Sequence, residues 1–293
     1  MGAGAILSHV PEPIRRPFGS AELVETKRLE AIPVGEPVAE PPAAGFLDGI
    51  QRYSLAGRLG LNPVVRAHVA AAVLARSDGE LRVASEDDEQ FVAVPLDRLS
   101  ERQRQRLAEV GMPIHDCGAD ARAHPFLDLQ RAAELVQQRR ELLEVRVARE
   151  YARSSHAGWL VVDGSIMGHD LDCRILGVIK SHETQFFEGE ELETALTLAP
   201  GCRTSVFARI VQGRGRVHSW YLRLWPWEEH DLLYGLLRIE CMCREPVQEA
   251  TEVSRWLLAE RAPLSAPDGR WDRLIYPIRQ VEEYLRARTG GWI

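Results

Sequence analysis

Two short apolar runs of the chain each end in an Asp-Gly dipeptide, and they constrain the fold more than any other feature. The first reads Gly-Phe-Leu-Asp-Gly-Ile at residues 45–50, and the second reads Trp-Leu-Val-Val-Asp-Gly-Ser at 159–165. A short apolar run bounded by turn residues is typical of a buried strand. Segments with helical spacing alternate with such runs along the chain, which predicts an α/β domain with a mixed β-sheet flanked by helices.

The remaining pattern predicts further elements. Strands are expected at 91–94 and 175–180, followed by an antiparallel β segment at 204–239. Asn62-Pro63 is typical of an N-cap followed by the first helical residue, so we expect a helix at 64–76. Other helices are expected at 100–111, 128–154, 188–198, 249–260 and 277–287. Seven of the seventeen prolines lie in residues 1–42, which predicts an extended N-terminal arm before a domain at 43–293.

Composition excludes several classes of protein. The 293 residues carry 36 Lys and Arg against 43 Asp and Glu, so no overall basic charge indicates nucleic acid. The sequence contains no run of about 18 apolar residues, so we expect no membrane span. The five cysteines are scattered and odd in number, so we expect reduced thiols and a cytoplasmic protein.

The aspartates at the two strand ends are the strongest candidates for chemistry. Ligand groups gather at the ends of strands in α/β sheets, and Asp48 and Asp163 would form a hard oxygen site for Mg²⁺ or Mn²⁺. The alternative is that Asp-Gly is a common turn dipeptide. A third ligand is expected from the helix at 128–154, where either Glu144 or Glu150 lies on or beside the apolar stripe. Either glutamate has an alternative role in an ion pair with the arginine four residues before it.

The basic residues suggest two further roles. Lys27 and Lys180 are the only two lysines in the sequence. Because arginine replaces lysine almost everywhere else, Lys180 indicates that a compact ammonium group is needed after the strand at 175–180. The alternative is that Lys180 is an ordinary surface lysine. Arginines alternate with aromatic residues between 203 and 223, a pattern that suits single-stranded nucleic acid but also an amphipathic hairpin. The candidate DNA-binding residues are Arg52, Arg209, Arg214 and Arg216.

An ordered set of motifs resembles the NurA nuclease domain. It contains the strand that ends at Asp48, the Arg-x-x-x-Glu motif of Arg140 and Glu144, and Leu-Val-Val-Asp-Gly-Ser at 160–165. Gly-Val-Ile-Lys at 177–180 and Tyr-Pro at 276–277 complete it, so the resemblance covers about residues 45–287.

The resemblance implies an RNase H-like fold and Mn²⁺-dependent DNA cleavage, as a 5′–3′ exonuclease and single-strand endonuclease in DNA end processing. It also implies a homodimer that works with a hexameric HerA-type ATPase. Matched by position, Asp48, Glu144 and Asp163 would be metal ligands and Lys180 would be catalytic. Glu282 stands where the family often has histidine, and would be a further acidic ligand.

These observations favour a metal-dependent DNA nuclease that uses Mn²⁺ or Mg²⁺. The alternative is a catalytically weak RNase H-like scaffold that docks on a ring ATPase. A nucleotide- or sugar-phosphate-handling α/β enzyme is disfavoured, because the sequence has neither of the glycine-rich phosphate-binding motifs.

Overall fold

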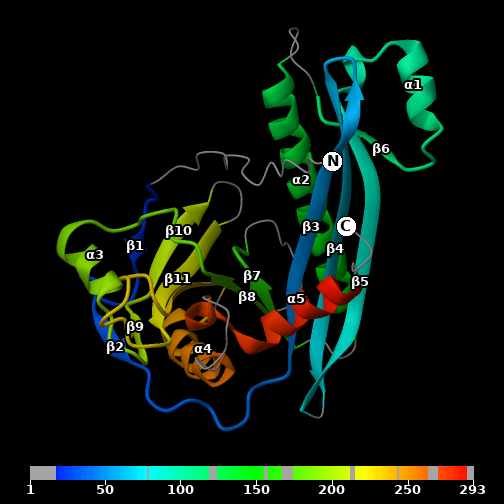
Figure 1. Cartoon of the computed structure of the whole chain (residues 1–293). Helices are drawn as coiled ribbons and strands as arrows, with labels where there is room; N and C mark the ends of the chain where they lie inside the picture. Colours follow the sequence, from blue (N-terminus) through cyan, green and yellow to red (C-terminus); the bar gives the residue numbers. More distant parts are fainter. Residues whose placement is uncertain are drawn as a thin grey trace.

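The computed structural model describes residues 18–77, 79–118, 124–154, 158–166, 174–211, 215–242, 244–262 and 270–288. The strands of these residues form one large mixed sheet (Figure 1). At its centre, β3 (Ala44–Leu59), β4 (Asn62–Ser77) and β5 (Glu80–Val94) form an antiparallel meander. Two shorter strands, β7 (Trp159–Asp163) and β8 (Arg174–Ile179), continue the sheet beyond β3 and run parallel to it.

The central strand order, β5-β4-β3-β7-β8, has only β4 running against the others. This is the arrangement of the RNase H-like fold, so the predicted α/β fold class is confirmed. Beyond β8 the sheet continues with antiparallel strands β12 (Leu236–Cys241), β11 (Gly215–Arg223) and β10 (Phe207–Val211). The predicted antiparallel β segment is therefore confirmed as well.

Short strands complete the sheet at its two ends. The strand β6 (Ile114–Asp116) pairs with β5, and β9 (Cys202–Thr204) pairs with β11. Within the segment 18–42, β1 (Glu22–Leu23) pairs with β10 and β2 (Ala31–Pro33) pairs with β9. Leu29 and Val34 of this segment are buried, so it lies extended against the domain. The proposed boundary after residue 42 remains a prediction.

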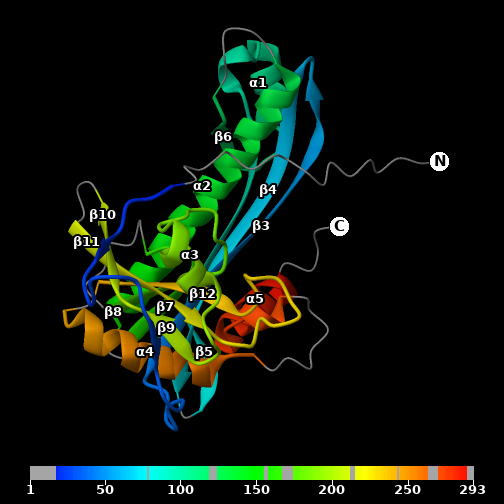
Figure 2. The ribbon, with the colours of Figure 1, turned by 90° about the vertical axis from the view of Figure 1, so that its left-hand side faces the viewer.

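Helices cover both faces of the central sheet. The long helix α2 (Pro125–Ala152) packs on one face, and α4 (Pro246–Glu260) and α5 (Tyr276–Arg288) pack on the other. Both views show β3, β4, β5 and α2 projecting as an arm, with α1 (Glu101–Ala108) and β6 at its far end (Figures 1 and 2). The remaining elements are α3 (Gly189–Leu196), η1 (Leu96–Arg98) and η2 (Trp271–Arg273).

The helix expected at 64–76 is wrong, because this segment is strand β4. Val65, Ala67 and Val69 pack in the core beneath α2, whereas Ala70 and Ala72 pack in the core on the opposite face. A strand buried on both faces has no polar alternation, so its apolar run cannot be distinguished from a buried helix by spacing. The proline that suggested a helix start is the second residue of the strand.

The other predicted helices are confirmed, with small shifts at their ends. Ser100 caps α1 through a capping box with Gln103, as the sequence indicates. The helix α2 begins three residues earlier than expected, at Pro125, with His124 as its N-cap. Within the described residues, no helix is long and apolar enough to cross a membrane.

The expectation of reduced cysteines is wrong at Cys241. Cys241, at the end of β12, is in a disulfide bond. Cys117 and Cys202 carry free thiols.

One buried carboxylate joins three parts of the sheet. Glu240 of β12 is fully buried and forms ion pairs with Arg209 of β10 and Arg238 of its own strand. It also accepts hydrogen bonds from Ser165 Oγ at 2.6 Å and Ile166 N at 3.3 Å, in the chain that follows β7. Although burial opposes ionisation, the charges of Arg238 and Arg209 lower the pKa of Glu240, so the carboxylate is ionised at neutral pH.

We expect Glu240→Gln to lower the free energy of unfolding by about 3–5 kcal/mol, because it removes one partner of a buried ion-pair network. In the wild type, the contribution of Glu240 is present above the pKa of an unfolded glutamate and is lost as the pH falls through its lowered folded pKa. Urea denaturation at pH 7 tests this, with exposed Glu252→Gln as the control. An equal urea midpoint for both variants would contradict the role given to Glu240.

Candidate active site

The candidate site lies where the sheet splits. The strand β3 pairs with β7 only through residues 44–47, and β7 ends at Asp163. Beyond this point β3 continues to Leu59, with β4 as its hydrogen-bonded neighbour in the described sheet. Asp48 is the first residue of β3 past the last pair, so both aspartates stand at the start of the gap.

Two glycines make this split possible. Gly164 follows Asp163 with φ of 119°, a conformation that L side chains rarely adopt, and its N–H donates to Val178 O at 2.9 Å. This turns the chain away from β3. Gly49 follows Asp48 and donates its N–H to Asp48 Oδ1 at 2.8 Å.

The third carboxylate reaches the gap from the other side of the sheet. Asp48 lies on the same face of β3 as Phe46, which packs in the core with α4 and α5, whereas Glu144 belongs to α2 on the opposite face. A Cβ atom added to Gly49 would lie 2.3 Å from Glu144 Oε1, so the Glu144 carboxylate lies directly against Gly49. The carboxylates of Asp48 and Glu144 therefore both contact one glycine, from opposite faces of the sheet.

Two cations accompany the carboxylates. Lys180 Nζ, just past the end of β8, donates to Asp163 Oδ2 at 2.8 Å. Arg140 forms an ion pair with Glu144 one helical turn later, and its Nε donates to Gln51 Oε1 at 3.2 Å. Both cations line a cleft of about 550 Å³ that also takes residues from β3, β7, η2 and α5. The lining residues are Asp48, Gly49, Ile50, Arg140, Asp163, Gly164, Ile179, Lys180, Ser181, Arg270, Arg273 and Glu282.

The pKa values show that negative charge is crowded in the cleft. Burial raises the pKa of Asp48 well above its usual range, and the charges of Asp163 and Glu144 raise it further, against the opposing charge of Lys180. Burial also raises the pKa of Glu144 to about 7, although Arg140 acts in the opposite direction. The site therefore favours an additional positive charge, either a proton or a metal ion.

The structure brings together the four residues that the sequence singles out as catalytic candidates. Asp48, Asp163 and Lys180 line the cleft, and Glu144 reaches it beside Gly49. Glu150 is exposed and lines a separate cavity on the outer face of α2, so Glu144 is the glutamate placed at the site.

Glu282 lies on α5 and lines the same cleft. Its Oε1 is 2.5 Å from Arg286 and 3.8 Å from Arg270, so it would have to leave both arginines to bind a metal. Its role as a ligand remains a prediction.

The three described arginines that were proposed for DNA binding lie outside the cleft lining. Arg209 is held by buried Glu240 and stacks on Phe186, and Arg216 is paired with Glu22 at the other end of the sheet. Arg214 lies outside the described residues. Arg52 lies four residues beyond Asp48 on the same face of β3.

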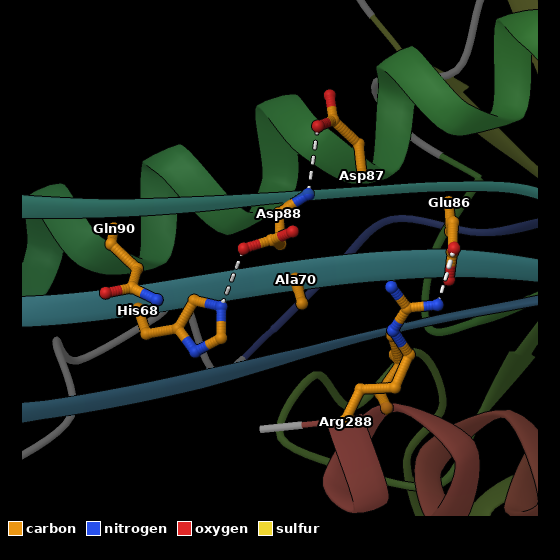
Figure 3. A pocket seen from close by; sticks show the side chains of 8 residues that line it. His68, Ala70, Glu86, Asp87, Asp88, Gln90 and Arg288 are labelled. Atoms are coloured by element: carbon orange, nitrogen blue, oxygen red, sulfur yellow. Dashed lines mark hydrogen bonds and ion pairs between the residues drawn. The ribbon is translucent and has the colours of Figure 1, made fainter. Parts of the chain in front are cut away.

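A second cavity, of about 290 Å³, opens further along this face, over β4 and β5 beside the end of α5 (Figure 3). Its acidic groups are paired, since Glu86 contacts Arg288 and Asp88 lies 3.1 Å from His68 Nε2 (Figure 3). The lining is nevertheless mainly acidic, unlike that of the first cleft. The residues are His68, Ala70, Glu86, Asp87, Asp88, Gln90, Leu285 and Arg288.

Sequence reasoning missed two arginines of the cleft. Arg270 and Arg273 flank Trp271-Asp272 just before the Tyr-Pro motif that opens α5. Their spacing of three residues could have indicated that both side chains lie on one side of a helical turn. The local sequence does not indicate that this turn, η2, faces the cleft.

The raised pKa of Glu144 predicts an unusual pH dependence of stability. Folding raises this pKa from 4.5 to about 7, so the folded chain binds more protons than the unfolded chain between these values. The free energy of unfolding should therefore decrease as the pH rises from about 4.5 to about 7, and Glu144→Gln should flatten this decrease. Urea denaturation across this pH range, without divalent ions, tests the slope, and Glu150→Gln is the matched control. An unchanged slope in Glu144→Gln would contradict the assigned environment.

The chain has structural likeness to known proteins. The chain is similar to the crystal structure of the NurA nuclease from Sulfolobus solfataricus, with 11% sequence identity and a TM-score of 0.49. The match covers 94% of this chain and 86% of that chain. No family model and no curated protein sequence matches the chain.

Proposed function

We propose that this protein is a metal-dependent nuclease that hydrolyses phosphodiester bonds at the split in its sheet. The observation that carries the proposal is the meeting of Asp48, Glu144 and Asp163, from β3, α2 and β7, beside Lys180 in one cleft. Several carboxylates around a small volume, with a cation next to them, are the groups that phosphoryl-transfer chemistry with metal ions requires.

The donor set fits a hard divalent cation in chemistry and charge. Carboxylate oxygens are the preferred ligands of Mg²⁺ and Mn²⁺, and the raised pKa of Asp48 reflects repulsion that such an ion would relieve. Among the described residues, no three acidic, histidine or cysteine side chains are gathered closely enough to hold an ion as they stand. Asp163 and Glu144 are instead bonded to Lys180 and Arg140, so binding requires these ion pairs to open.

The residues then have distinct roles. A bound Mn²⁺ or Mg²⁺ supplies the charge that activates water and stabilises the leaving oxygen. Asp48 of β3, Asp163 at the end of β7 and Glu144 of α2 would hold such an ion. Once released from Asp163, the Lys180 ammonium offsets negative charge on the phosphate under attack.

The ordered motifs extend the proposal to the substrate and partners. By their resemblance to the NurA domain, the substrate is DNA, cleaved as by a 5′–3′ exonuclease and single-strand endonuclease during end processing. The same resemblance supports a homodimer that works with a HerA-type hexameric ATPase, with Mn²⁺ preferred.

We expect the wild type to release nucleotides from single-stranded DNA with Mn²⁺, and Asp163→Asn to reduce the rate at least about a hundredfold, as when a charge-stabilising group is removed. Glu144→Gln should reduce it similarly, whereas Glu150→Gln on the same helix should not. Cleavage is followed on an end-labelled oligonucleotide with Mn²⁺ or with EDTA. Equal cleavage by the wild type and Asp163→Asn would place any activity elsewhere. It would favour the scaffold that docks on a ring ATPase.

Gly49→Ala should weaken metal binding without unfolding the chain. The added methyl would lie 2.3 Å from Glu144 Oε1, so the carboxylate must leave its position against Gly49. We expect Mn²⁺ affinity, measured by titration calorimetry, to fall by about 10–100-fold, as when a group that orients a ligand is lost. Gly57→Ala on the same strand is the control, because an added Cβ there meets nothing within 4 Å. Equal affinities in the two variants would show that the Glu144 position does not matter.

A further inference from the structure

The chain that follows Asp163 is fixed at a point two strands away. Ser165 Oγ donates to Glu240 Oε2 at 2.6 Å, and the N–H of Ile166 donates to the same oxygen at 3.3 Å. Asp163 ends β7, whereas Glu240 lies on β12, and β8 lies between these two strands. The turn after β7 must therefore pass across β8 to reach its acceptor.

A glycine of β8 leaves room for this crossing. Gly177 is the register partner of Glu240 on the neighbouring strand, so the two residues lie on the same face of the sheet. A Cβ atom added to Gly177 would lie 2.6 Å from Gly164 O and 3.2 Å from Ile166 N. The turn therefore lies directly on the backbone of Gly177, and a side chain at this position would force it away from β8.

The acceptor is itself held in place. Glu240 is fully buried, and Arg209 and Arg238 both form ion pairs with its Oε1 atom. Its other oxygen, Oε2, accepts the hydrogen bonds from Ser165 and Ile166. The carboxylate of Glu240 therefore cannot rotate without breaking contacts on both of its sides, which makes it a firm anchor for the turn.

The anchor matters because the residue after Asp163 is a glycine. Gly164 adopts a φ of 119°, and glycine has more conformational freedom to lose on folding than any other residue. A turn built on it needs contacts on its far side to keep a single conformation. On the cleft side, the ion pair between Asp163 and Lys180 has to open before a metal ion can bind. The position of Asp163 then depends on the backbone on either side of it.

We infer that Ser165 is a positioning residue for Asp163, and that it acts by tying the turn to Glu240 across Gly177. The inference rests on the proposed function, because it concerns how the Asp163 carboxylate is presented to a metal ion. Ser165 is outside the cleft lining, and its hydroxyl donates to Glu240, so its effect on the site is indirect.

Valine and threonine at position 165 test the hydroxyl, because the two side chains have the same shape and only threonine can donate to Glu240. We expect Ser165→Val to weaken Mn²⁺ binding by about 10–100-fold in titration calorimetry, as when a group that orients a metal ligand is lost. It should also lower kcat on single-stranded DNA and leave KM for the DNA unchanged. Ser165→Thr should restore both the Mn²⁺ affinity and kcat.

A buried serine elsewhere in the chain separates positioning from a general loss of stability. Ser254 of α4 is buried and accepts a hydrogen bond from Trp220 Nε1 at 2.9 Å. Ser254→Ala should lower the urea midpoint, as Ser165→Val does, but should leave the Mn²⁺ affinity and kcat unchanged. If Ser165→Val weakens neither quantity more than Ser254→Ala does, the role of Ser165 is structural and the inference is wrong.

The two lysines of the chain give a further readout that needs neither metal nor cleavage. In protein isotope-labelled at lysine alone, the NMR signals of Lys180 report on its contact with Asp163, and exposed Lys27 is the internal reference. In EDTA, we expect Ser165→Val and Gly177→Ala to shift the side-chain signals of Lys180, whereas Ser165→Thr should leave them in place.

The combined outcomes distinguish this inference from the proposed function. If the wild type cleaves DNA but Ser165→Val keeps its Mn²⁺ affinity, its kcat and its Lys180 signals, the positioning role is wrong and the nuclease stands. If the wild type neither binds Mn²⁺ nor cleaves DNA, but the Lys180 signals shift as expected, the nuclease is wrong. Ser165 would then still hold Asp163 in place.

Discussion

The site depends on the unequal lengths of two neighbouring strands. Since β7 stops at Asp163 while β3 runs on to Leu59, the sheet loses a strand beside Asp48. Within an intact sheet, side chains on the two faces are separated by the backbone layer. At the split, a side chain from α2 can reach those on the opposite face. The glycine after each aspartate serves this arrangement, because Gly164 turns β7 away and Gly49 leaves room for Glu144.

The electrostatics of the cleft follow from that convergence. Carboxylates that are mostly buried and close to one another cannot all be ionised without a counter-charge, which is why burial and repulsion between them raise the pKa values of Asp48 and Glu144. Lys180 and Arg140 supply part of the counter-charge through direct ion pairs. If a divalent cation bound there, Asp48, Asp163 and Glu144 would hold it, and Lys180 and Arg140 would be free to face a phosphate. The same two side chains thus balance charge before binding and receive substrate afterwards.

The sequence predicts the apolar runs well and the long-range partners poorly. Asp163 ends β7 and Lys180 follows the end of β8, as the local pattern predicts. Asp48 was expected at a strand end too, but β3 continues past it to Leu59, because its second half still pairs with β4. The choice of Glu144 over Glu150 depended on the Arg-x-x-x-Glu motif, because both glutamates lie on or beside the apolar stripe of the same helix. Only the path of β3 decides which of them reaches the gap between β3 and β7. The strand β4 was mistaken for a helix because both its faces are buried. The role of Arg209 was also hidden, since its partner Glu240 lies two strands away. The sequence could not place Arg270 and Arg273 in the cleft, because only the tertiary fold brings η2 to it.

The scarcity of lysine acquires a physical meaning in this cleft. Lys27 is exposed, whereas Lys180 contacts Asp163 with less than a quarter of its side chain accessible. A planar guanidinium at this position would bind the carboxylate through two hydrogen bonds and would hold it more firmly against exchange for a metal. An ammonium makes a single, less directional contact, and can turn from the carboxylate to a phosphate without a change of backbone.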